Sequence, residues 1–411
     1  MGPGNALRAL RRLTTDYPKM LRDLPLDEHL VLLDAQCGRS ICGNMFYVAR
    51  ELAENPAYAG LELWISTRHS SRREAAALLA DAGLDGRVNL VFRNSRRYFK
   101  LLASAKWLFT DTCFPEEWVK RAGQVVANTW HGTPLKCMGR DIREGFQDID
   151  NVRKNLLDAD FLSFPSRYAA EAMGGAYMLD EGVGDGGGPT LLFTGYPRNT
   201  AFFGDTRREK ARARLGVGTA RAIAYLPTHR PPRPDAAQPV DFQHVLAGLD
   251  SCLGEGQVLF AKLHPIEAAR IDFSALAHVR PFPRTLELYE TLAACDALLT
   301  DYSSVMFDYA VCGRPIVLFA FDEAEYFASR GAYLRLEELP FPKAKTPAAA
   351  LAALEGTQSG RTAFLERFCP RESPHAASDL CARVIAGVRS PRIVEARLSG
   401  VSREARLSGV S

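Results

Sequence analysis

The chain has 411 residues, of which 47% are hydrophobic and 24% charged, an ordinary balance for a soluble globular protein that excludes fibrous and wholly disordered classes. At about 150 residues per domain, this length predicts two or three domains. The 51 basic and 48 acidic side chains give a net charge of +3, so the overall charge makes no case for a nucleic-acid binder.

Cysteine usage and hydropathy indicate where the protein works. The nine cysteines show no paired CxxC spacing, which is typical of a reduced, intracellular protein and not of a disulfide framework or a zinc site. No stretch approaches the ~18 apolar residues of a membrane span. The first residues, MGPGNALRALRRL, carry arginine where a signal peptide needs an apolar run. We expect a soluble or membrane-peripheral protein.

The first half of the chain alternates strand-like and helix-like runs. Strand-like runs at 29–35, 61–67 and 88–92 are separated by helix-like runs at 44–55 and 75–82. Three more strand-like runs, WLFTDT, QVVANTW and ADFLSFP, continue the pattern to residue 165. Short apolar strands separated by helices predict parallel sheets that are covered on both faces.

A glycine-dense stretch at 174–188 predicts a surface loop. A second α/β series follows it, with strand-like runs at 221–228, 257–265, 297–301 and 314–321. We expect an α/β protein with two Rossmann-type, doubly wound domains, an N-terminal domain of residues 1–200 and a C-terminal domain of residues 201–390. The sequence EARLSGVS occurs twice within residues 391–411, which indicates a tail.

The strongest candidate site is NTWHGTPLK, Asn128 to Lys136. His131 follows a strand, at the edge where open α/β sheets place ligands, and its side chain suits a general base near neutral pH. Gly132 allows close backbone approach, Thr133 offers a hydroxyl and Lys136 adds positive charge. The alternative interpretation is a core histidine that caps a turn.

The segment KLHP places Lys262 and His264 at the end of a strand in the second half. Two histidines at strand ends of two separate domains predict an active-site cleft between the domains, with one histidine from each wall. The alternative is a chance pairing, because the chain has eight histidines.

The segment TDYSSVMFDYA contains Asp301, Ser303 and Ser304, and either serine can cap the helix that follows. The N–H groups at the start of that helix predict a phosphate site, although an ordinary helix cap has the same pattern. Other residues after strand ends would add donors for a pyrophosphate: Arg198, Thr228 and Arg230.

Several nucleotide-binding and catalytic motifs are missing from the sequence. There is no GxGxxG or GxxxxGK[ST] loop, which argues against a Rossmann dehydrogenase and a P-loop NTPase, and there is no GxSxG nucleophile elbow. No acidic pair at a strand end is placed to hold a divalent cation, so we expect neither a metal nor another cofactor.

Four segments, WHGTPLK, GYPRN, KLHP and TDYSSVMFDYAVCGRPIVLF, together resemble the CDP-glycerol glycerophosphotransferase family of teichoic acid primases and polymerases, in the family's order. The resemblance implies a GT-B-like fold with the active site between two Rossmann-type domains. The first domain, residues 1–200, would face the acceptor and the membrane, and the second, residues 201–390, would bind CDP-glycerol. It also implies transfer of glycerol phosphate from CDP-glycerol to a hydroxyl of a membrane-bound, lipid-linked acceptor, with release of CMP. His131 and His264 match the family's essential histidines. The chain reads LPTHR where many members read APTWR, so His229 replaces an aromatic residue.

This resemblance leads to a mechanism and to alternatives. We assign His131 as the base, and we expect His264, Arg198 and the Ser303/Ser304 helix end to hold the donor's pyrophosphate; the roles of the two histidines are interchangeable at this point. A CDP-ribitol phosphotransferase and a GT-B glycosyltransferase are the alternatives within the class. A non-catalytic membrane-peripheral module is the third.

Basic clusters suggest how the enzyme would reach a lipid-linked acceptor. Residues 1–100 contain 15 basic and 11 acidic side chains, a balance that suits an anionic membrane surface. Two clusters stand out, and the second interleaves with Tyr98 and Phe99: Arg8, Arg11 and Arg12, and then Arg93, Arg96, Arg97 and Lys100. We expect a cytoplasmic enzyme on the inner face of the cell membrane. The alternative for each cluster is a solvated helix face.

Overall fold

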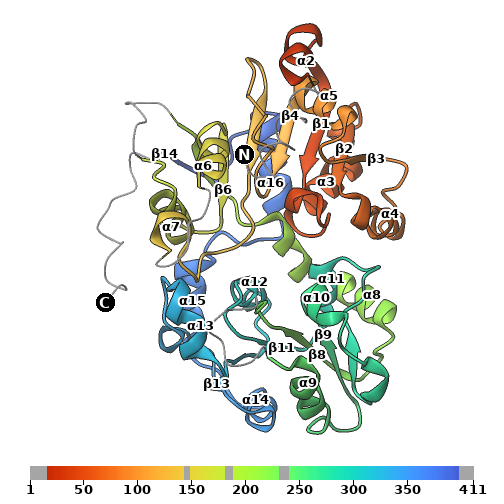
Figure 1. Ribbon diagram of the computed structural model, residues 1–411, viewed down its shortest axis with the longest axis vertical. Helices are drawn as coiled ribbons and strands as arrows, with labels where there is room; N and C mark the ends of the chain where they lie inside the picture. The colour runs from red at the N-terminus through yellow and green to blue at the C-terminus, as the bar shows by residue number, and fades with distance from the viewer. Residues whose placement is uncertain (1–15, 143–148, 181–187, 231–239, 398–411) are drawn as a thin grey trace, which may run out of the picture. The chain divides into compact units, whose positions relative to one another are not determined.

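The computed structural model describes residues 16–142, 149–180, 188–230 and 240–397, and these residues fall into two α/β units. Unit 1 comprises the described residues of Met1–His131, Gln147–Thr200 and Arg371–Ala405, and unit 2 comprises those of Gly132–Phe146 and Ala201–Pro370. Each unit is built on its own sheet with helices packed against it (Figure 1).

The sheet of unit 1 has eight described strands in the order β14-β7-β6-β5-β4-β1-β2-β3, and only β14 among them runs antiparallel to its neighbour. Leu30 to Leu33 in the interior strand β1 are at most 4% exposed, as in a parallel strand that is covered on both faces. The strands are β1 (Asp27–Asp34), β2 (Glu62–Thr67), β3 (Val88–Phe92), β4 (Ala105–Thr110), β5 (Val125–Asn128), β6 (Phe161–Phe164), β7 (Thr190–Phe193) and β14 (Val394–Arg397).

Serine side chains cap the N-termini of two of the helices of unit 1. Ser95 accepts a hydrogen bond from the N–H of Tyr98 at the start of α5, and Ser166 does the same at the start of α7. The loop predicted from residue 174 begins later, because α7 continues through two buried glycines to Ala176. The helices are α2 (Tyr17–Asp23), α3 (Asn44–Glu54), α4 (Arg72–Asp81), α5 (Arg96–Ser104), α6 (Asp150–Leu157), α7 (Arg167–Ala176) and α16 (Ala376–Ile385).

The sheet of unit 2 has six described strands, all parallel, in the order β10-β9-β8-β11-β12-β13. They are β8 (Arg221–Leu226), β9 (Gln257–Ala261), β10 (Val279–Pro281), β11 (Ala297–Thr300), β12 (Ile316–Phe319) and β13 (Lys343–Ala344). The helices are α8 (Asp205–Leu215), α9 (Phe242–Asp250), α10 (Pro265–Ala268), α11 (Leu288–Ala294), α12 (Val305–Ala310), α13 (Glu323–Arg330), α14 (Pro347–Ala353) and α15 (Arg361–Phe368). No helix in the described ranges is both long and apolar enough to cross a membrane.

The order in which strands are added to each sheet reverses once, and in open α/β sheets ligands usually bind at such a point. In unit 1 the chain adds β2 and β3 on one side of β1 and then adds β4 on the other side. In unit 2 it adds β9 and β10 on one side of β8 and then adds β11 on the other. The carboxyl ends of the strands at such a switch point form the usual binding crevice of an open α/β sheet.

The C-terminal segment differs from the expected domain division. Residues 371–397 belong to unit 1 and not to the second domain, because α16 packs on α3 and β14 pairs with β7. Figure 1 shows the blue helix α16 among the red and orange elements of unit 1. Part of the expected tail, Val394–Arg397, is therefore a strand that covers an otherwise open sheet edge.

A second difference concerns the segment after His131. The described part of Gly132–Phe146 belongs to unit 2, whereas the sequence placed it in the first domain. Lys136 forms a β-bridge with Ala332, and the N–H of Tyr333 donates to the carbonyl oxygen of Leu135 at 2.9 Å. Backbone pairing thus attaches Gly132, Thr133 and Lys136 to unit 2.

Candidate active site

In unit 1, a strained turn follows β5 and carries His131. Trp130 has a left-handed backbone (φ +52°), which costs an L-residue of this size about 1–2 kcal/mol. The side-chain oxygen of Asn128 accepts from the N–H of Trp130 at 2.8 Å, and the amide of Asn44 donates to the carbonyl oxygen of Trp130 at 2.8 Å. These bonds hold the turn in its strained form.

The backbone around His131 fixes the tautomer of its ring. Nδ1 lies 2.9 Å from the carbonyl oxygen of Asp111, and a carbonyl oxygen can only accept, so Nδ1 carries the proton. In the neutral ring the lone pair is then on Nε2. The imidazole also packs against the ring of Trp130, with 4.2 Å between centroids. An oriented imidazole with its lone pair on Nε2 is suited to act as a general base.

Asp111 itself is a buried acid that the sequence reasoning missed. Burial, helped by the nearby charge of Asp34, raises the pKa of its carboxyl to about 7, although the hydrogen bond from Gln36 and the charge of Arg198 both lower it. The N–H of Gln36 donates to Oδ1 at 2.7 Å. A sequence signal existed, because Asp111 ends FTD after β4 just as Asp301 ends LTD after β11.

Arg198 also stabilises the turn that carries His131. Its guanidinium donates to the carbonyl oxygen of His131 at 2.9 Å, and its backbone N–H donates to the side-chain oxygen of Asn44 at 3.2 Å. The residue is 4% exposed. In this structure Arg198 positions His131, whereas the sequence suggested contact with the donor's phosphates.

In unit 2, Asp301 organises the switch point between β8 and β11. Its carboxylate is buried and accepts from the N–H of Thr228 at 2.9 Å and from the hydroxyl of Thr228 at 2.7 Å. Arg230 pairs with Asp301 at 2.8 Å and with Asp322 at 2.6 Å. Two carboxylates therefore compensate the one guanidinium, and these ion pairs order the turn. Arg230 offers less positive charge to a pyrophosphate than the sequence suggested.

The serines after β11 have partly exposed side chains. Ser304 is the N-cap of α12 without a side-chain capping bond, and the hydroxyl of Ser303 accepts from the N–H of Val305 at 3.4 Å. Because α12 has only six residues, its dipole is weaker than the sequence suggested. The two hydroxyls remain candidate donors to a phosphate.

The predicted lysines differ in their surroundings. Lys262 is exposed after β9. Lys136 is half-buried, and its ammonium donates to the hydroxyl of Tyr326 at 3.2 Å and lies 5.7 Å from the centre of that ring. Gly132 and Thr133, a few residues before Lys136 in the sequence, are buried.

His264 has the opposite tautomer to His131. It is the N-cap of α10, and its Nδ1 accepts from the N–H of Ile266 at 3.4 Å. An amide N–H can only donate, so Nδ1 holds the lone pair and the proton is on Nε2. His131 therefore presents a proton acceptor at Nε2, and His264 presents a hydrogen-bond donor.

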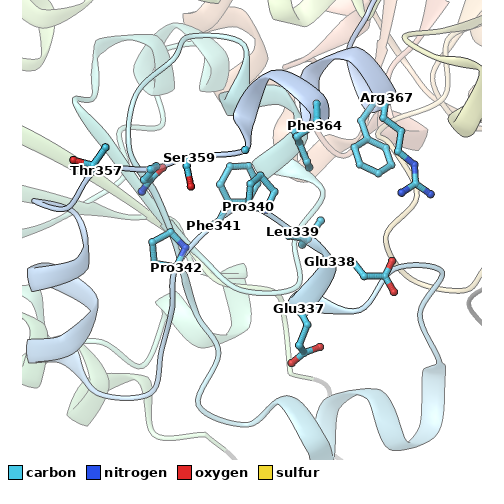
Figure 2. Close-up of a pocket in the computed structure, with 14 residues that line it drawn as sticks. Glu337, Glu338, Leu339, Pro340, Phe341, Pro342, Thr357, Ser359, Phe364 and Arg367 are labelled. Atoms are coloured by element: carbon cyan, nitrogen blue, oxygen red, sulfur yellow. The ribbon is translucent and has the colours of Figure 1, made fainter.

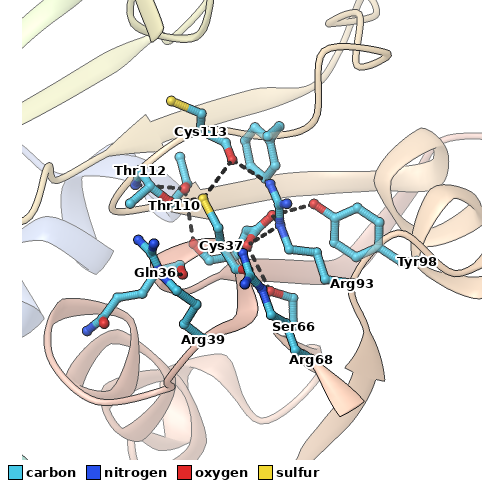
Figure 3. A network of polar contacts seen from close by, with 12 residues as sticks. Gln36, Cys37, Arg39, Ser66, Arg68, Arg93, Tyr98, Thr110, Thr112 and Cys113 are labelled. Atoms are coloured by element: carbon cyan, nitrogen blue, oxygen red, sulfur yellow. Dashed lines mark hydrogen bonds and ion pairs between the residues drawn. The ribbon is translucent and has the colours of Figure 1, made fainter. Parts of the chain in front are cut away.

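The membrane-facing assignment needs correction at Arg93. Its guanidinium pairs with the buried carboxylate of Asp34 at 2.9 Å. It also donates to the carbonyl oxygen of Cys113, as Figure 3 shows. Tyr98 is buried and donates its hydroxyl to Asp34, and Phe99 is also buried, so these rings pack in the core.

The remaining basic residues of that cluster lie on α5. Arg96 and Arg97 are exposed, and the guanidinium of Arg97 lies 4.1 Å from the ring centre of Trp64. The first cluster, Arg8, Arg11 and Arg12, lies outside the described residues.

A cavity of about 630 Å³ in unit 2 is separate from these groups (Figure 2). It lies beside the loop that leads into β13 and the start of α15, and none of the predicted site residues lines it. Glu337 and Glu338 on its wall disfavour a phosphate ligand there. Within the described ranges, no group of three or more His, Cys, Asp or Glu side chains could hold a metal ion.

Two α/β units, each with a wholly or mainly parallel sheet, are the architecture of a GT-B protein. The wall teichoic acid polymerase TagF, solved with a histidine-to-alanine substitution, has the same fold, with a TM-score of 0.75 and 22% identity over 93% of this chain and 97% of that chain. A profile of the family "CDP-Glycerol:Poly(glycerophosphate) glycerophosphotransferase" matches residues 17–386. The chain belongs to this family and is an enzyme of the transferase class.

Two curated relatives agree with this assignment. The teichoic acid poly(glycerol phosphate) polymerase of Bacillus spizizenii is 27% identical over 84% of this chain and 89% of its own length. The teichoic acid glycerol-phosphate transferase of Staphylococcus aureus is 27% identical over 72% of this chain and 79% of its own length.

Proposed function

We propose that this enzyme transfers glycerol phosphate from CDP-glycerol to a hydroxyl of a membrane-bound, lipid-linked acceptor and releases CMP, in the synthesis of teichoic acid or a related wall or capsule polymer. The family match supports the donor and the reaction class. The observation that carries the mechanism is the opposite tautomers of His131 and His264, which supply one proton acceptor and one hydrogen-bond donor.

In the proposed reaction, the acceptor hydroxyl gives its proton to Nε2 of His131 while its oxygen bonds to the phosphorus that carries glycerol. The bond from that phosphorus to the oxygen bridging to CMP breaks, and its electron pair leaves with CMP. Nε2–H of His264 donates to a phosphate oxygen and stabilises the charge that develops there. The hydroxyls of Ser303 and Ser304 and the ammonium of Lys262 are the further proposed donors to the phosphates.

We propose that neither a metal nor another cofactor takes part, because histidine, lysine and hydroxyl donors can stabilise the phosphate charge directly. Turnover should survive exhaustive treatment with EDTA. Complete loss of activity that magnesium or manganese restores would contradict this.

The experiment that tests the function is incubation of purified protein with CDP-glycerol and a lipid-linked disaccharide acceptor. Parallel reactions contain CDP-ribitol or UDP-sugars, and the released nucleotide is identified by chromatography. Release of CMP from CDP-glycerol, dependent on the acceptor, is the expected result. CMP from CDP-ribitol alone would change the donor, UDP release would indicate a glycosyltransferase, and no release would favour a binding module.

Because the proposed acceptor is lipid-linked, we also propose that the enzyme works in the cytoplasm on the inner face of the cell membrane. The exposed side chains of Arg96, Arg97 and Lys100 on α5 are the described cations that would meet anionic lipid headgroups.

A further inference from the structure

One carboxylate in unit 2 connects the loops after two neighbouring strands. Oε1 of Glu267 accepts from Nδ1–H of His229 at 2.9 Å and from the backbone N–H of Arg230 at 3.1 Å. Its other oxygen, Oε2, lies 3.3 Å from the backbone nitrogen of His264, whose N–H donates to it. The Glu267 side chain is 13% exposed, so little water competes for these contacts. Glu267 therefore ties the loop after β8 to the loop after β9.

The ring of His229 covers one face of His264. The two imidazoles are stacked, with 4.0 Å between centroids and 26° between planes. The bond from Nδ1 to Glu267 fixes the plane of the His229 ring. The hydrogen bond from the N–H of Ile266 to Nδ1 and the stacking contact with His229 together orient the His264 ring. This orientation sets the direction of its Nε2–H.

We propose that Glu267 and His229 are positioning residues for His264: Glu267 holds the backbone of His264 and the ring of His229, and His229 holds the plane of the His264 imidazole. This inference rests on the proposed function, in which Nε2–H of His264 donates to the donor's phosphate. A displacement of about 1 Å in such a group can cost 10²-fold in rate, so the cost of losing either residue should fall on kcat.

Two conservative variants separate the two contacts. In Glu267→Gln, the amide oxygen can still accept from His229 and Arg230, but the amide NH₂ that replaces Oε2 cannot accept from His264. In His229→Phe, the phenyl ring can still stack on His264, but it cannot bond to Glu267. His229→Ala removes both the stacking and the bond.

The kinetic test measures kcat and KM for CDP-glycerol together with the affinity for CDP by calorimetry. We expect His229→Ala and Glu267→Gln to lower kcat by about 10- to 100-fold with KM and CDP affinity within about twofold of wild type, and His229→Phe to recover most of kcat. His69→Ala is the matched control, because the His69 ring also stacks, on Phe92 in unit 1 with 3.7 Å between centroids, and the proposed reaction gives His69 no role. It should leave kcat unchanged.

Imidazole nitrogen spectra provide a readout that does not depend on activity. In protein with ¹⁵N-labelled histidine at pH 8, the His264 signal, assigned by its loss in His264→Gln, should show the proton on Nε2. In His229→Ala this signal should broaden or shift toward a mixture of tautomers, while His229→Phe should retain it.

Three results would overturn the inference: wild-type kcat in both His229→Ala and Glu267→Gln, a loss of CDP affinity in His229→Ala that phenylalanine does not restore, or a wild-type His264 ring with its proton on Nδ1. The second result would mean that His229 binds the nucleotide itself. A wild-type protein that releases no CMP would instead overturn the proposed function, and the nitrogen spectra would still decide the orientation of His264.

Discussion

Asp111 contacts His131 through its main-chain carbonyl oxygen, and Ile266 contacts His264 through its main-chain N–H. One backbone group accepts and the other donates, so the two rings carry their protons on opposite nitrogens. This difference supports the proposed assignment of the base to His131, whereas in the sequence the two roles were interchangeable, because both residues are histidines that follow a strand. The orientation of a backbone group next to a side chain has no signature in the order of residues.

Replacing His131 tests that assignment. We expect His131→Ala to lower the rate of CMP release by 10²–10⁴-fold, the usual cost of losing a general base. The side chain is exposed, so the midpoint of thermal unfolding should stay close to that of wild type. Turnover is measured by chromatography and folding by circular dichroism. A folded variant with wild-type turnover would remove His131 from the mechanism.

Asp111, whose main-chain carbonyl oxygen contacts His131, gives a prediction on how stability depends on pH. The pKa of Asp111 is raised to about 7 in the folded protein, mainly by burial, against an ordinary value of 3.8. Between these values the folded state binds more protons than the unfolded state, so the free energy of unfolding falls as pH rises from about 4 to 7, by up to ~1.4 kcal/mol per unit of pKa difference.

We expect Asp111→Asn to remove this loss, because an amide does not ionise and its oxygen can still accept from Gln36. The unfolding midpoint of the variant minus that of wild type should increase between pH 5 and pH 8. A difference that is constant with pH would show that Asp111 is ionised throughout.

At the scale of elements, the C-terminal segment packs closely against a glycine in the earlier part of unit 1. Gly195, after β7, has φ +81°, and a Cβ on it would lie 2.6 Å from the carbonyl oxygen of Arg371 and 2.9 Å from a carboxylate oxygen of Glu372. The same carboxylate accepts from the N–H of Tyr196 at 3.1 Å. The chain can return to unit 1 this closely only because residue 195 has no side chain.

We expect Gly195→Ala to destabilise the protein by more than about 1 kcal/mol, since backbone strain and steric conflict add. Gly83→Ala is the control, because Gly83 has a similar φ of +69° with nothing within 4 Å of the added Cβ. The difference between the two urea midpoints isolates the conflict with the C-terminal segment. Equal midpoints would mean that this segment moves aside without cost.

The elements that the sequence predicted well are those with a strong hydrophobic pattern. The strand predicted at 88–92 is β3, and the helix predicted from Asn44 is α3, because continuous apolar runs mark parallel strands and a buried face marks a helix. β14 was missed, because its residues are largely exposed at a sheet edge and lie in a repeated polar segment. Glu267 was missed as well, although a carboxylate three residues after His264 at a helix start has the spacing of a capping box.

At the scale of the whole molecule, the distribution of charge gives a prediction on membrane binding. We expect binding to anionic vesicles to fall as salt shortens the Debye length from ~10 Å at 0.1 M to ~3 Å at 1 M. Changing Arg96, Arg97 and Lys100 together to Gln should weaken binding further, at about 1 kcal/mol for each residue near the surface. Co-sedimentation with anionic and neutral vesicles is the measurement.

Arg93 is left unchanged in this variant, because its loss would leave the buried charge of Asp34 uncompensated. A second variant changes Arg8, Arg11 and Arg12 to Gln. Binding that is insensitive to lipid charge, to salt and to both variants would contradict an electrostatic attachment. Activity on a soluble acceptor should survive in both variants.

The return of the chain to unit 1 also determines the order in which the protein can fold during synthesis. Helix α16 and strand β14 leave the ribosome after the whole of unit 2, although they complete the packing on α3 and the sheet edge at β7. Domains fold as units while the chain is made. Unit 2 can therefore finish folding while unit 1 still exposes the open edge of β7. The first unit to be synthesised is the last to be completed, and a ribosome that stops before residue 371 leaves an unprotected strand edge that another chain can pair with.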